Sequence, residues 1–315
     1  DVVYDNLGNY IVVGRFDGPA SFGGANFNTA GLSDIYVAKY NSLGVHQWSK
    51  SFGGTGPDAD LDRDVGVDSS RNVIIAGNFW NSVNFGGGAL TSAGSTDIFV
   101  LKLDQNGNHQ WSKRFGGTGA DRINAMAVLP AGTINMAGSF QNTVAFGNIS
   151  LTSAGNYDAL LLRMATTGTV QTAKRYGSTD QDHAQAIAVD TASNIYLGGS
   201  FAGTVDFGKG AVASNSASVD AFALKLDTAG GTTWAKTFGS NATDTVTGIA
   251  VDGTRQPTFV GRFRSSLNLG GGMVTANGSA SDAFAVAYDT NGTFRWSKNW
   301  GGTGEDRPFD AAAEL

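Results

Sequence analysis

The sequence predicts an all-β fold, a β-propeller of five blades that each hold four antiparallel strands in about 62 residues. Two observations carry this prediction. The chain repeats itself from one end to the other, and each repeat contains four short apolar runs separated by turn-forming residues. A third observation agrees with them, because no stretch combines a helical apolar period with capping residues.

Two independent markers define the repeat. An aspartate before an apolar run recurs at Asp34, Asp97, Asp158, Asp220 and Asp282, and a lysine recurs at the same intervals at Lys50, Lys113, Lys174, Lys236 and Lys298. The repeat units are 1–63, 64–124, 125–185, 186–247 and 248–309, and we expect residues 310–315 to begin one more strand. Because the units leave no other segment, we expect a single propeller domain over 1–315.

The fourth unit shows the strand pattern, with runs at 186–189, 194–201, 221–226 and 233–238 that we name strands a to d. Asn-Gly and similar pairs lie between strands c and d, where tight hairpin turns need positive φ. Strand a is apolar but small, which suits the innermost strand of a blade. In strand b a glycine precedes a phenylalanine by two residues, as at Gly199 and Phe201, and we expect a close backbone approach there between blades.

Composition excludes several classes of protein. The chain has 45 Gly, 5 Pro and no Cys, 41% hydrophobic and 15% charged residues, and a net charge of −6. A disordered chain, a disulfide framework, a thiol site and a nucleic-acid partner are therefore not expected. No apolar run is long enough for a transmembrane segment. The sequence starts at Asp1 with neither Met nor a signal-like stretch, so we expect a piece of a longer protein.

The units resemble the SBBP-type β-propeller repeat of bacterial secreted and surface proteins. The resemblance rests on Ala186–Asp190, Asn194–Phe201, Leu103–Gly107 and Trp111–Gly117, and it covers all five units. It implies a propeller, an extracellular or cell-surface location, and seven blades. This chain supplies five units and a partial one, so two alternatives stay open: a five-bladed propeller, or part of a larger ring. The third unit departs from the pattern with Thr172, where the other units have tryptophan.

The extra length of each unit lies between strands b and c. There a small hairpin is expected, with Phe22, Phe85, Phe146, Phe207 and Leu269 at equivalent places. If strand a is innermost, the b–c and d–a loops lie on one side, which we name the loop face. Loops of this kind are where binding usually resides.

Two sets of aspartates belong to the loop face. One set precedes strand c and consists of Asp34, Asp97, Asp158, Asp220 and Asp282; the other lies in the d–a loops and consists of Asp60, Asp121, Asp182, Asp244 and Asp306. One hypothesis is a Ca²⁺ site in each blade, because hard cations bind clustered carboxylate oxygens. The alternative is that each aspartate accepts backbone N–H bonds and fastens its loop.

Positions that differ between units are the candidates for a specific site. The residue after the constant phenylalanine is Asp17, Trp80, Gln141, Ala202 or Arg264. An exposed tryptophan at position 80 would stack on sugars or anchor a protein. Arg15, Arg262 and Arg264 would share one sector if the first and last blades were neighbours, and could bind an anionic group.

Nothing in the sequence supports catalysis. The constant lysine lies on strand d, where it protects an edge strand from pairing, although a ligand-binding role is an alternative. His46 and His109 are expected in c–d hairpins, and His183 is the one histidine on the loop face. No Gly-x-Ser-x-Gly elbow, His-Glu-x-x-His motif or P-loop is present.

The sequence therefore favours a non-catalytic extracellular bacterial propeller that acts as an interaction, adhesion or assembly scaffold through its loop face. Its partners would be another protein, a surface polysaccharide or further copies of itself. The alternative is a glycan-binding propeller that uses Trp80 and polar b–c loops, either with Ca²⁺ or without it. No other cofactor is expected. An enzyme acting on a polysaccharide is the third hypothesis.

Overall fold

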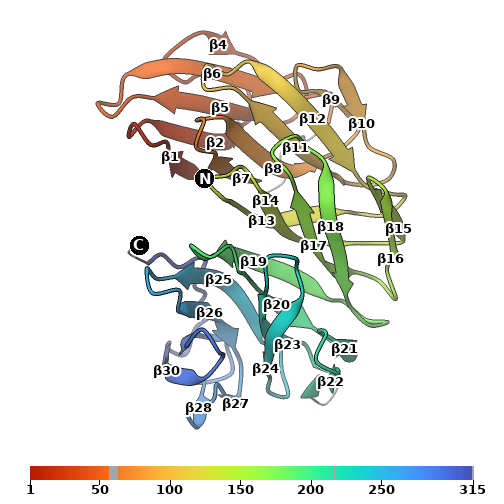
Figure 1. The fold of residues 1–315 in the computed structure, drawn as a ribbon, viewed down its shortest axis with the longest axis vertical. Coiled ribbons are helices and arrows are strands. Elements are labelled where there is room, and N and C mark those ends of the chain that lie inside the picture. Colours follow the sequence, from red (N-terminus) through yellow and green to blue (C-terminus); the bar gives the residue numbers. More distant parts are fainter. Residues whose placement is uncertain (57–62, 216–217, 314–315) are drawn as a thin grey trace. The chain divides into compact units, whose positions relative to one another are not determined.

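The computed structural model of the chain describes residues 1–56, 63–215 and 218–313, which hold thirty β-strands and no α-helix (Figure 1). The predicted all-β class is therefore confirmed. Within the same residues, no helix is long and apolar enough to cross a membrane.

Twenty of the strands form five four-stranded sheets, in which the strands follow one another in chain order apart from an inserted hairpin. Each sheet with its hairpin is named a blade, and its strands keep the names a to d. The strands are β1 (Val2–Tyr4), β2 (Tyr10–Phe16), β5 (Asp34–Tyr40) and β6 (His46–Phe52) in blade 1; β7 (Arg63–Val67), β8 (Val73–Phe79), β11 (Asp97–Leu103) and β12 (His109–Phe115) in blade 2; β13 (Arg122–Val128), β14 (Ile134–Phe140), β17 (Asp158–Met164) and β18 (Val170–Tyr176) in blade 3; β19 (His183–Val189), β20 (Ile195–Phe201), β23 (Asp220–Leu226) and β24 (Thr232–Phe238) in blade 4; and β25 (Thr245–Val251), β26 (Pro257–Phe263), β29 (Asp282–Tyr288) and β30 (Phe294–Trp300) in blade 5.

The remaining ten strands pair into one small hairpin between strands b and c of each blade, as the sequence predicts. They are β3 (Ala20–Ser21) with β4 (Asn26–Phe27), β9 (Ser82–Asn84) with β10 (Ala89–Thr91), β15 (Thr143–Phe146) with β16 (Ile149–Thr152), β21 (Thr204–Asp206) with β22 (Ala211–Ala213), and β27 (Ser266–Asn268) with β28 (Met273–Thr275). These pairs are antiparallel.

Strand a begins about three residues earlier than the repeat units suggest, at Arg122, His183 and Thr245 in blades 3 to 5. Each of these residues directly follows a d–a aspartate. In blade 4 the pairing of strands a and b starts at His183, opposite Ser200, so the strand starts as soon as the loop is fastened.

The small residues of strand a allow adjacent blades to approach closely. A Cβ atom at Gly66 of β7 would collide with the side chain of Val128 in β13. Beside this contact, the carboxylate of Asp64 accepts the backbone N–H of Met126 at 2.7 Å. Strand a of blade 2 therefore packs directly against strand a of blade 3, as expected of innermost strands.

The glycine of strand b makes room inside its own blade, whereas the sequence analysis expected an approach between blades. A Cβ atom at Gly199 or Gly261 would collide with a carbonyl of strand a, from His183 or Thr245. The register of the a–b pair is irregular next to these residues, after Ala184 and after Val246. A bulge in strand a thus brings its backbone against strand b, and only glycine leaves enough space.

A large apolar residue of the b–c hairpin packs into the core of its blade, and it is phenylalanine in blades 1 to 4 and Leu269 in blade 5. The ring of Phe85 is fully buried and stacks on Phe99 of β11, with 4.5 Å between the ring centroids. Phe52, from strand d of the preceding blade, lies 5.7 Å from the same ring. The hairpins are therefore anchored parts of the core, and only their outward side chains are free to vary.

The chain divides into two compact units, and the boundary between them runs through the third blade. Unit 1 comprises 1–136, 140–152 and 162–173, and unit 2 comprises 137–139, 153–161 and 174–315. Unit 1 holds blades 1 and 2 with most of blade 3, and unit 2 holds blades 4 and 5.

The expected extra strand after residue 309 does not form over 310–313, and residues 314 and 315 lie outside the described part of the chain. Asp310 lies against Gly248 of β25, and the carbonyl of Pro308 accepts a hydrogen bond from Thr247 at 2.7 Å. The difference from Val2–Tyr4 is pairing: Val2–Tyr4 pairs with β2, whereas the contacts of 308–310 with β25 are not strand pairing.

Candidate functional site

The aspartates that precede strand c are buried and fasten the b–c loop. In each of the five, Oδ2 accepts a backbone N–H from four or five residues earlier, at 2.9–3.1 Å. The carboxyl group packs against the glycine that directly follows strand d, and a Cβ atom at Gly116 or Gly301 would collide with it. Arginine approaches two of them, since Arg114 pairs with Asp97 and Arg175 with Asp158.

The aspartates of the d–a loop join one blade to the next. Oδ1 of Asp121 accepts the backbone N–H of Gln141 at 3.1 Å, and Oδ2 accepts that of Gly117 at 2.8 Å. Its own N–H donates to the carbonyl of Thr96 at 2.8 Å. One buried residue thus holds the b–c loop of blade 2, its own loop, and the end of strand b in blade 3.

Asp182 and Asp244 repeat this geometry in unit 2. Burial raises the pKa of Asp121, Asp182 and Asp244 to about 6, and the charge of the neighbouring strand-c aspartate adds to the increase. The backbone N–H bonds oppose this increase. Asp306 accepts the N–H of Gly302 at 2.9 Å, whereas Asp60 lies outside the described residues.

The observed hydrogen bonds are those expected if each aspartate accepts backbone N–H bonds and fastens its loop. Within 1–56, 63–215 and 218–313, no group of three or more His, Asp or Glu side chains lies close enough to hold a metal ion. In four of the five strand-c aspartates Oδ1 is buried without a hydrogen-bond partner, namely in Asp34, Asp97, Asp158 and Asp282. The Ca²⁺ hypothesis stays a prediction that binding measurements must decide.

At the position after the constant phenylalanine, the side chain differs between blades. In blades 3, 4 and 5 the backbone N–H of this residue is bound by a d–a aspartate. Asp17 and Arg264 are exposed, Trp80 and Gln141 are half-buried, and Ala202 is buried. The sequence analysis expected an exposed Trp80, but this residue is half-buried. Gln141 is also used internally, because its Oε1 accepts the N–H of Ala120 at 2.9 Å.

The predicted arginine cluster is brought together in part. Arg262 and Arg264 lie on or next to β26 in unit 2, whereas Arg15 is in unit 1 and pairs with Asp17 at 3.7 Å. Glu305 pairs with Arg262 at 3.1 Å and with Arg307 at 2.6 Å. These arginines lower the pKa of Glu305, so an acidic residue of the chain itself already neutralises part of this cluster.

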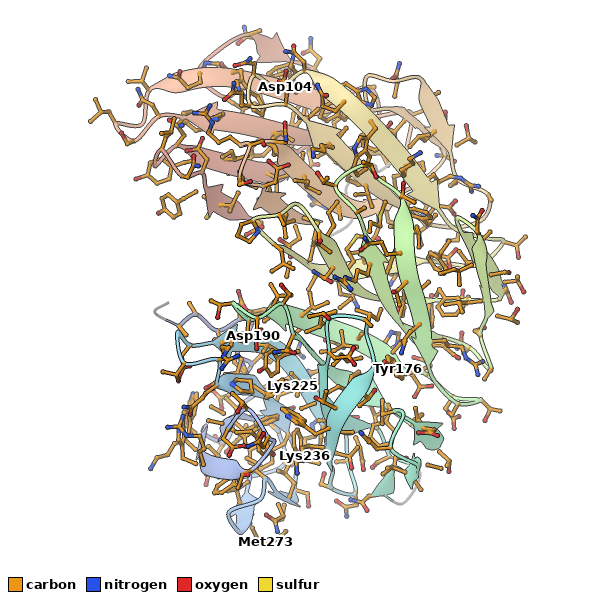
Figure 2. The ribbon with its side chains drawn as sticks, viewed as in Figure 1. Asp104, Tyr176, Asp190, Lys225, Lys236 and Met273 are labelled. Atoms are coloured by element: carbon orange, nitrogen blue, oxygen red, sulfur yellow. The ribbon has the colours of Figure 1, made fainter. Side chains whose placement is uncertain are left out.

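Two of the constant lysines, Lys236 and Lys50, line cavities between adjacent blades. Lys236 lines a cavity of about 400 Å³ with Tyr288 and Phe294, and its ammonium group is 5.9 Å from the Tyr288 ring centroid (Figure 2). Lys50 lines a cavity of about 200 Å³ with Phe85 and His109. The edge that these lysines were expected to protect is therefore covered by the next blade.

The histidines make local contacts. The Nε2 atoms of His46 and His109 lie 3.1 and 3.2 Å from serine hydroxyls of the same strand, those of Ser49 and Ser112. His183 starts β19, and its ring lies 5.2 Å from that of Tyr157.

The outward side chains of the b–c hairpins carry pairs of hydroxyl groups. The pairs are Ser82 with Thr91 at 3.1 Å, Thr143 with Thr152 at 2.8 Å, and Ser266 with Thr275 at 2.8 Å. The outward surface of these hairpins is thus polar, and Met273 of β28 is a large apolar side chain exposed on it (Figure 2).

Three exposed aromatic side chains of the first and fifth blades were missed from the sequence. Trp296 and Trp300 of β30 are 41% and 50% exposed, and Tyr4 of β1 is 62% exposed. Trp296 occupies the repeat position of Trp48, so the repeat pattern by itself did not distinguish it.

Two curated proteins are similar to this chain, and no family model matches it. The chain is 25% identical over 307 residues to the regulatory protein FlaEY of Caulobacter vibrioides, which covers 88% of the chain and 31% of that protein. It is 23% identical over 315 residues to the uncharacterized WD repeat-containing protein L264 of Acanthamoeba polyphaga mimivirus, which covers 79% of the chain and 22% of that protein. The chain thus spans less than a third of the length of either relative.

The repeated four-stranded sheets and the WD-repeat relative together identify the fold as a β-propeller, with a blade count consistent with five. The WD-repeat likeness supports the propeller type in general, and the narrower SBBP assignment is matched by no family model.

Proposed function

We propose that this chain is a non-catalytic propeller that serves as a scaffold for binding other proteins. One observation carries the proposal. Among the described residues, every large apolar side chain that is exposed lies within 2–45 or 273–309, and these are Val2, Tyr4, Leu7, Leu32, Leu43, Val45, Met273, Trp296, Trp300 and Phe309.

This distribution separates the end blades from the middle ones. Blades 2, 3 and 4 cover their large apolar side chains, so the repeat itself does not require such exposure. Exposed apolar patches on soluble proteins mark binding surfaces, and tryptophan and tyrosine contribute most per residue when a partner covers them. The relatives support the same class of function, because one is named a regulatory protein and the other a WD-repeat protein.

Site-specific photo-crosslinking tests the proposal. A photoreactive residue is placed at Leu43 or Phe309 in the end blades, and at Ser150 in blade 3 as the matched exposed control. After incubation with extract of the producing cells, we expect crosslinked protein bands from the two end-blade positions and none from the control. Equal crosslinking at all three positions, or none at any, would contradict the proposal.

Glycan binding is the second candidate, and the hydroxyl pairs of the hairpins together with the half-buried indole of Trp80 favour it. A glycan array with Ca²⁺ and again with EDTA tests it. Binding that is lost in Trp80→Ala would support the glycan hypothesis, and sensitivity to EDTA would support bound Ca²⁺. A blank array in both buffers would exclude it. The extracellular or cell-surface location and the adhesive role stay predictions from the repeat resemblance.

A further inference from the structure

A polar cavity of about 320 Å³ lies between blades 1 and 2, at the end of the blades opposite the b–c hairpins. We name it the turn cavity, because turns and strand ends form its walls. Four amide side chains line it, those of Asn9, Gln47, Gln105 and Asn106, and all its lining residues belong to unit 1. Small-molecule sites have volumes of about 300–1,000 Å³, so the turn cavity has room for one small polar ligand.

A buried lysine in the turn cavity has a donor without an acceptor. Lys39 of β5 lines the cavity, and its side chain is only 7% exposed. Its ammonium group has three N–H donors. One pairs with Oδ2 of Asp5 at 2.9 Å, and another approaches the carbonyl of Gln105 at 3.4 Å. The described part of the chain offers this group no third acceptor.

The equivalent lysine of blade 2 shows what the turn cavity lacks. Lys102 pairs with Asp68 at 2.9 Å, and it donates to the carbonyl and to the hydroxyl of Thr166 at 3.3 and 2.5 Å. Thr166 corresponds to Gln105, which has no hydroxyl. Because a buried donor without an acceptor is unfavourable, the third donor of Lys39 favours a bound ligand.

Arg71 brings an unpaired positive charge to the same cavity. It is the fourth residue of the a–b turn 68–72 and has a φ of 64°, where blades 1 and 3 have Gly8 and Gly132 with φ values of 74° and 84°. Within the residues that the structure describes, its guanidinium forms no hydrogen bond or ion pair. A left-handed conformation is unfavourable for arginine, so its presence here indicates a use for the guanidinium.

Charge and shape define the ligand. Asp5 and Lys39 neutralise each other, so Arg71 gives the turn cavity one net positive charge. This matches a carboxylate better than a phosphate monoester, which carries nearly two negative charges at neutral pH. The indole of Trp48 adds a flat wall, held by a hydrogen bond from Nε1 to the Gln105 carbonyl at 3.0 Å. Amide side chains both donate and accept hydrogen bonds, as sugar hydroxyls do.

We propose that the turn cavity binds an acidic sugar, the hexuronic acid residue of a glycan. The guanidinium of Arg71 pairs with the sugar carboxylate. The third donor of Lys39 and the amides of Gln105 and Asn106 bind ring hydroxyls, and Trp48 covers one face of the sugar ring. The proposal is independent of the scaffold function and of the glycan site considered around Trp80.

The pair of blades 4 and 5 provides a matched comparison. Arg255 occupies the same turn position as Arg71 and has a φ of 65°. There Tyr196 replaces Ile11 opposite the strand-c lysine, and its hydroxyl donates to the Arg255 carbonyl at 3.0 Å. The ammonium group of Lys225, labelled in Figure 2, lies 5.5 Å from the Tyr196 ring centroid. The tyrosine thus contacts both the lysine and the turn.

Isothermal titration calorimetry and ligand-observed NMR with methyl β-D-glucuronide test the proposal. Methyl β-D-glucoside is the neutral probe, since it lacks only the carboxylate. We expect the glucuronide to bind with a dissociation constant of about 1 mM or less, at least about tenfold tighter than the glucoside.

Variants place the ligand in the turn cavity. Arg71→Gly introduces the residue of blades 1 and 3 and keeps the turn, and it should weaken glucuronide binding about tenfold and remove the preference over the glucoside. Arg255→Gly, at the equivalent position of blade 5, should leave binding unchanged. Gln105→Thr supplies the hydroxyl that Thr166 gives to Lys102, so binding should weaken about threefold to tenfold. Circular dichroism checks that each variant is folded.

Absence of glucuronide binding overturns the proposal, as does equal binding of the glucuronide and the glucoside. N-acetylglutamate amide carries a carboxylate without hydroxyls; if it binds as tightly as the glucuronide, the cavity takes an acidic peptide and the proposal is wrong. Binding that is lost in Trp80→Ala and kept in Arg71→Gly places the sugar elsewhere and also overturns it. The scaffold function is tested separately, by crosslinks from Leu43 and Phe309.

Discussion

At the residue scale, a carboxylate controls each loop junction. Asp244 accepts N–H bonds from Ser240 at 2.6 Å and from Arg264 at 3.0 Å while fully buried. Hydrogen bonds to a charged group contribute more than neutral ones, and a buried acceptor cannot be replaced by water. The fold therefore requires an aspartate at this position in each repeat, whereas the neighbouring side chains are free to vary.

Asp244→Asn is expected to lower the free energy of unfolding by about 1.5–3 kcal/mol, because the amide nitrogen cannot accept the second N–H bond. Urea unfolding followed by fluorescence measures this change. A control variant of the exposed Asp206 should have little effect, since that side chain bonds only its own turn.

The same residue predicts a pH dependence. The folded-state pKa of about 6 lies above the ordinary 3.8, so between these values the folded chain binds a proton that the unfolded chain does not. The contribution of Asp244 to stability is fully present below about pH 4 and is lost as pH rises through about 6. The advantage of wild type over Asp244→Asn should therefore shrink from about pH 4 to about pH 7 in urea unfolding. If the stability advantage of wild type grew over this range, burial would not be the dominant influence on the pKa of Asp244.

Two adjacent glycines offer a matched test of how closely strand d and the strand-c aspartate pack. A Cβ atom at Gly301 would collide with the carboxyl of Asp282, whereas none of the described atoms lies within 4 Å of one at Gly302. Gly301→Ala should reduce the thermal unfolding temperature by the equivalent of roughly 1–3 kcal/mol, and Gly302→Ala should leave it nearly unchanged. Equal effects of the two variants would contradict the packing described.

At the element scale, the b–c hairpin supplies core as well as surface. Its residues alternate, with Val83 and Phe85 buried and Ser82 and Asn84 exposed. This alternation explains the extra length of each repeat, because the hairpin closes the core on one side and forms the loop face on the other.

Phe85→Ala should cost about 3–5 kcal/mol of unfolding free energy, since a fully buried ring that packs on Phe99 and on Phe52 of the preceding blade is removed. Chemical denaturation measures the loss. Thr91→Ala on the outward side of the same hairpin is the control and should change stability by less than about 0.5 kcal/mol. A small effect of Phe85→Ala would mean that the hairpin is not part of the core.

At the scale of the whole molecule, stability comes from repeated contacts between consecutive blades within each unit. Three kinds of contact join one blade to the next in chain order: the hydrogen bonds from Trp48, Trp111 and Trp234 to a c–d turn of the following blade, the d–a aspartates, and the phenylalanines of the hairpins. In blade 3, Leu129 and Thr172 replace the a–b turn aspartate and the strand-d tryptophan of the other four blades, and Arg163 stands where blades 1, 2 and 4 have the strand-c lysine. The division of the chain into two compact units falls in this blade.

Metal removal is a test at this scale, because a Ca²⁺ site in each blade would affect all blades together. From the fastening geometry we expect the thermal unfolding temperature to be the same in Ca²⁺ and in EDTA. An increase with Ca²⁺ that saturates would instead assign the buried Oδ1 atoms of the strand-c aspartates to a cation.

The sequence by itself determined the all-β class, the repeat, the four strands of each blade and the hairpin between strands b and c. These follow from local periodicity and from turn residues, which act over a few positions and need no distant partner. The tertiary structure decided what the repeated residues touch. It left Trp80 half-buried, put the strand-b glycine against a bulge of its own blade, and left residues 310–313 without a strand. It also gave the strand-d tryptophans different exposures, because covering an indole depends on the blade packed against it and not on the residues beside it in the chain.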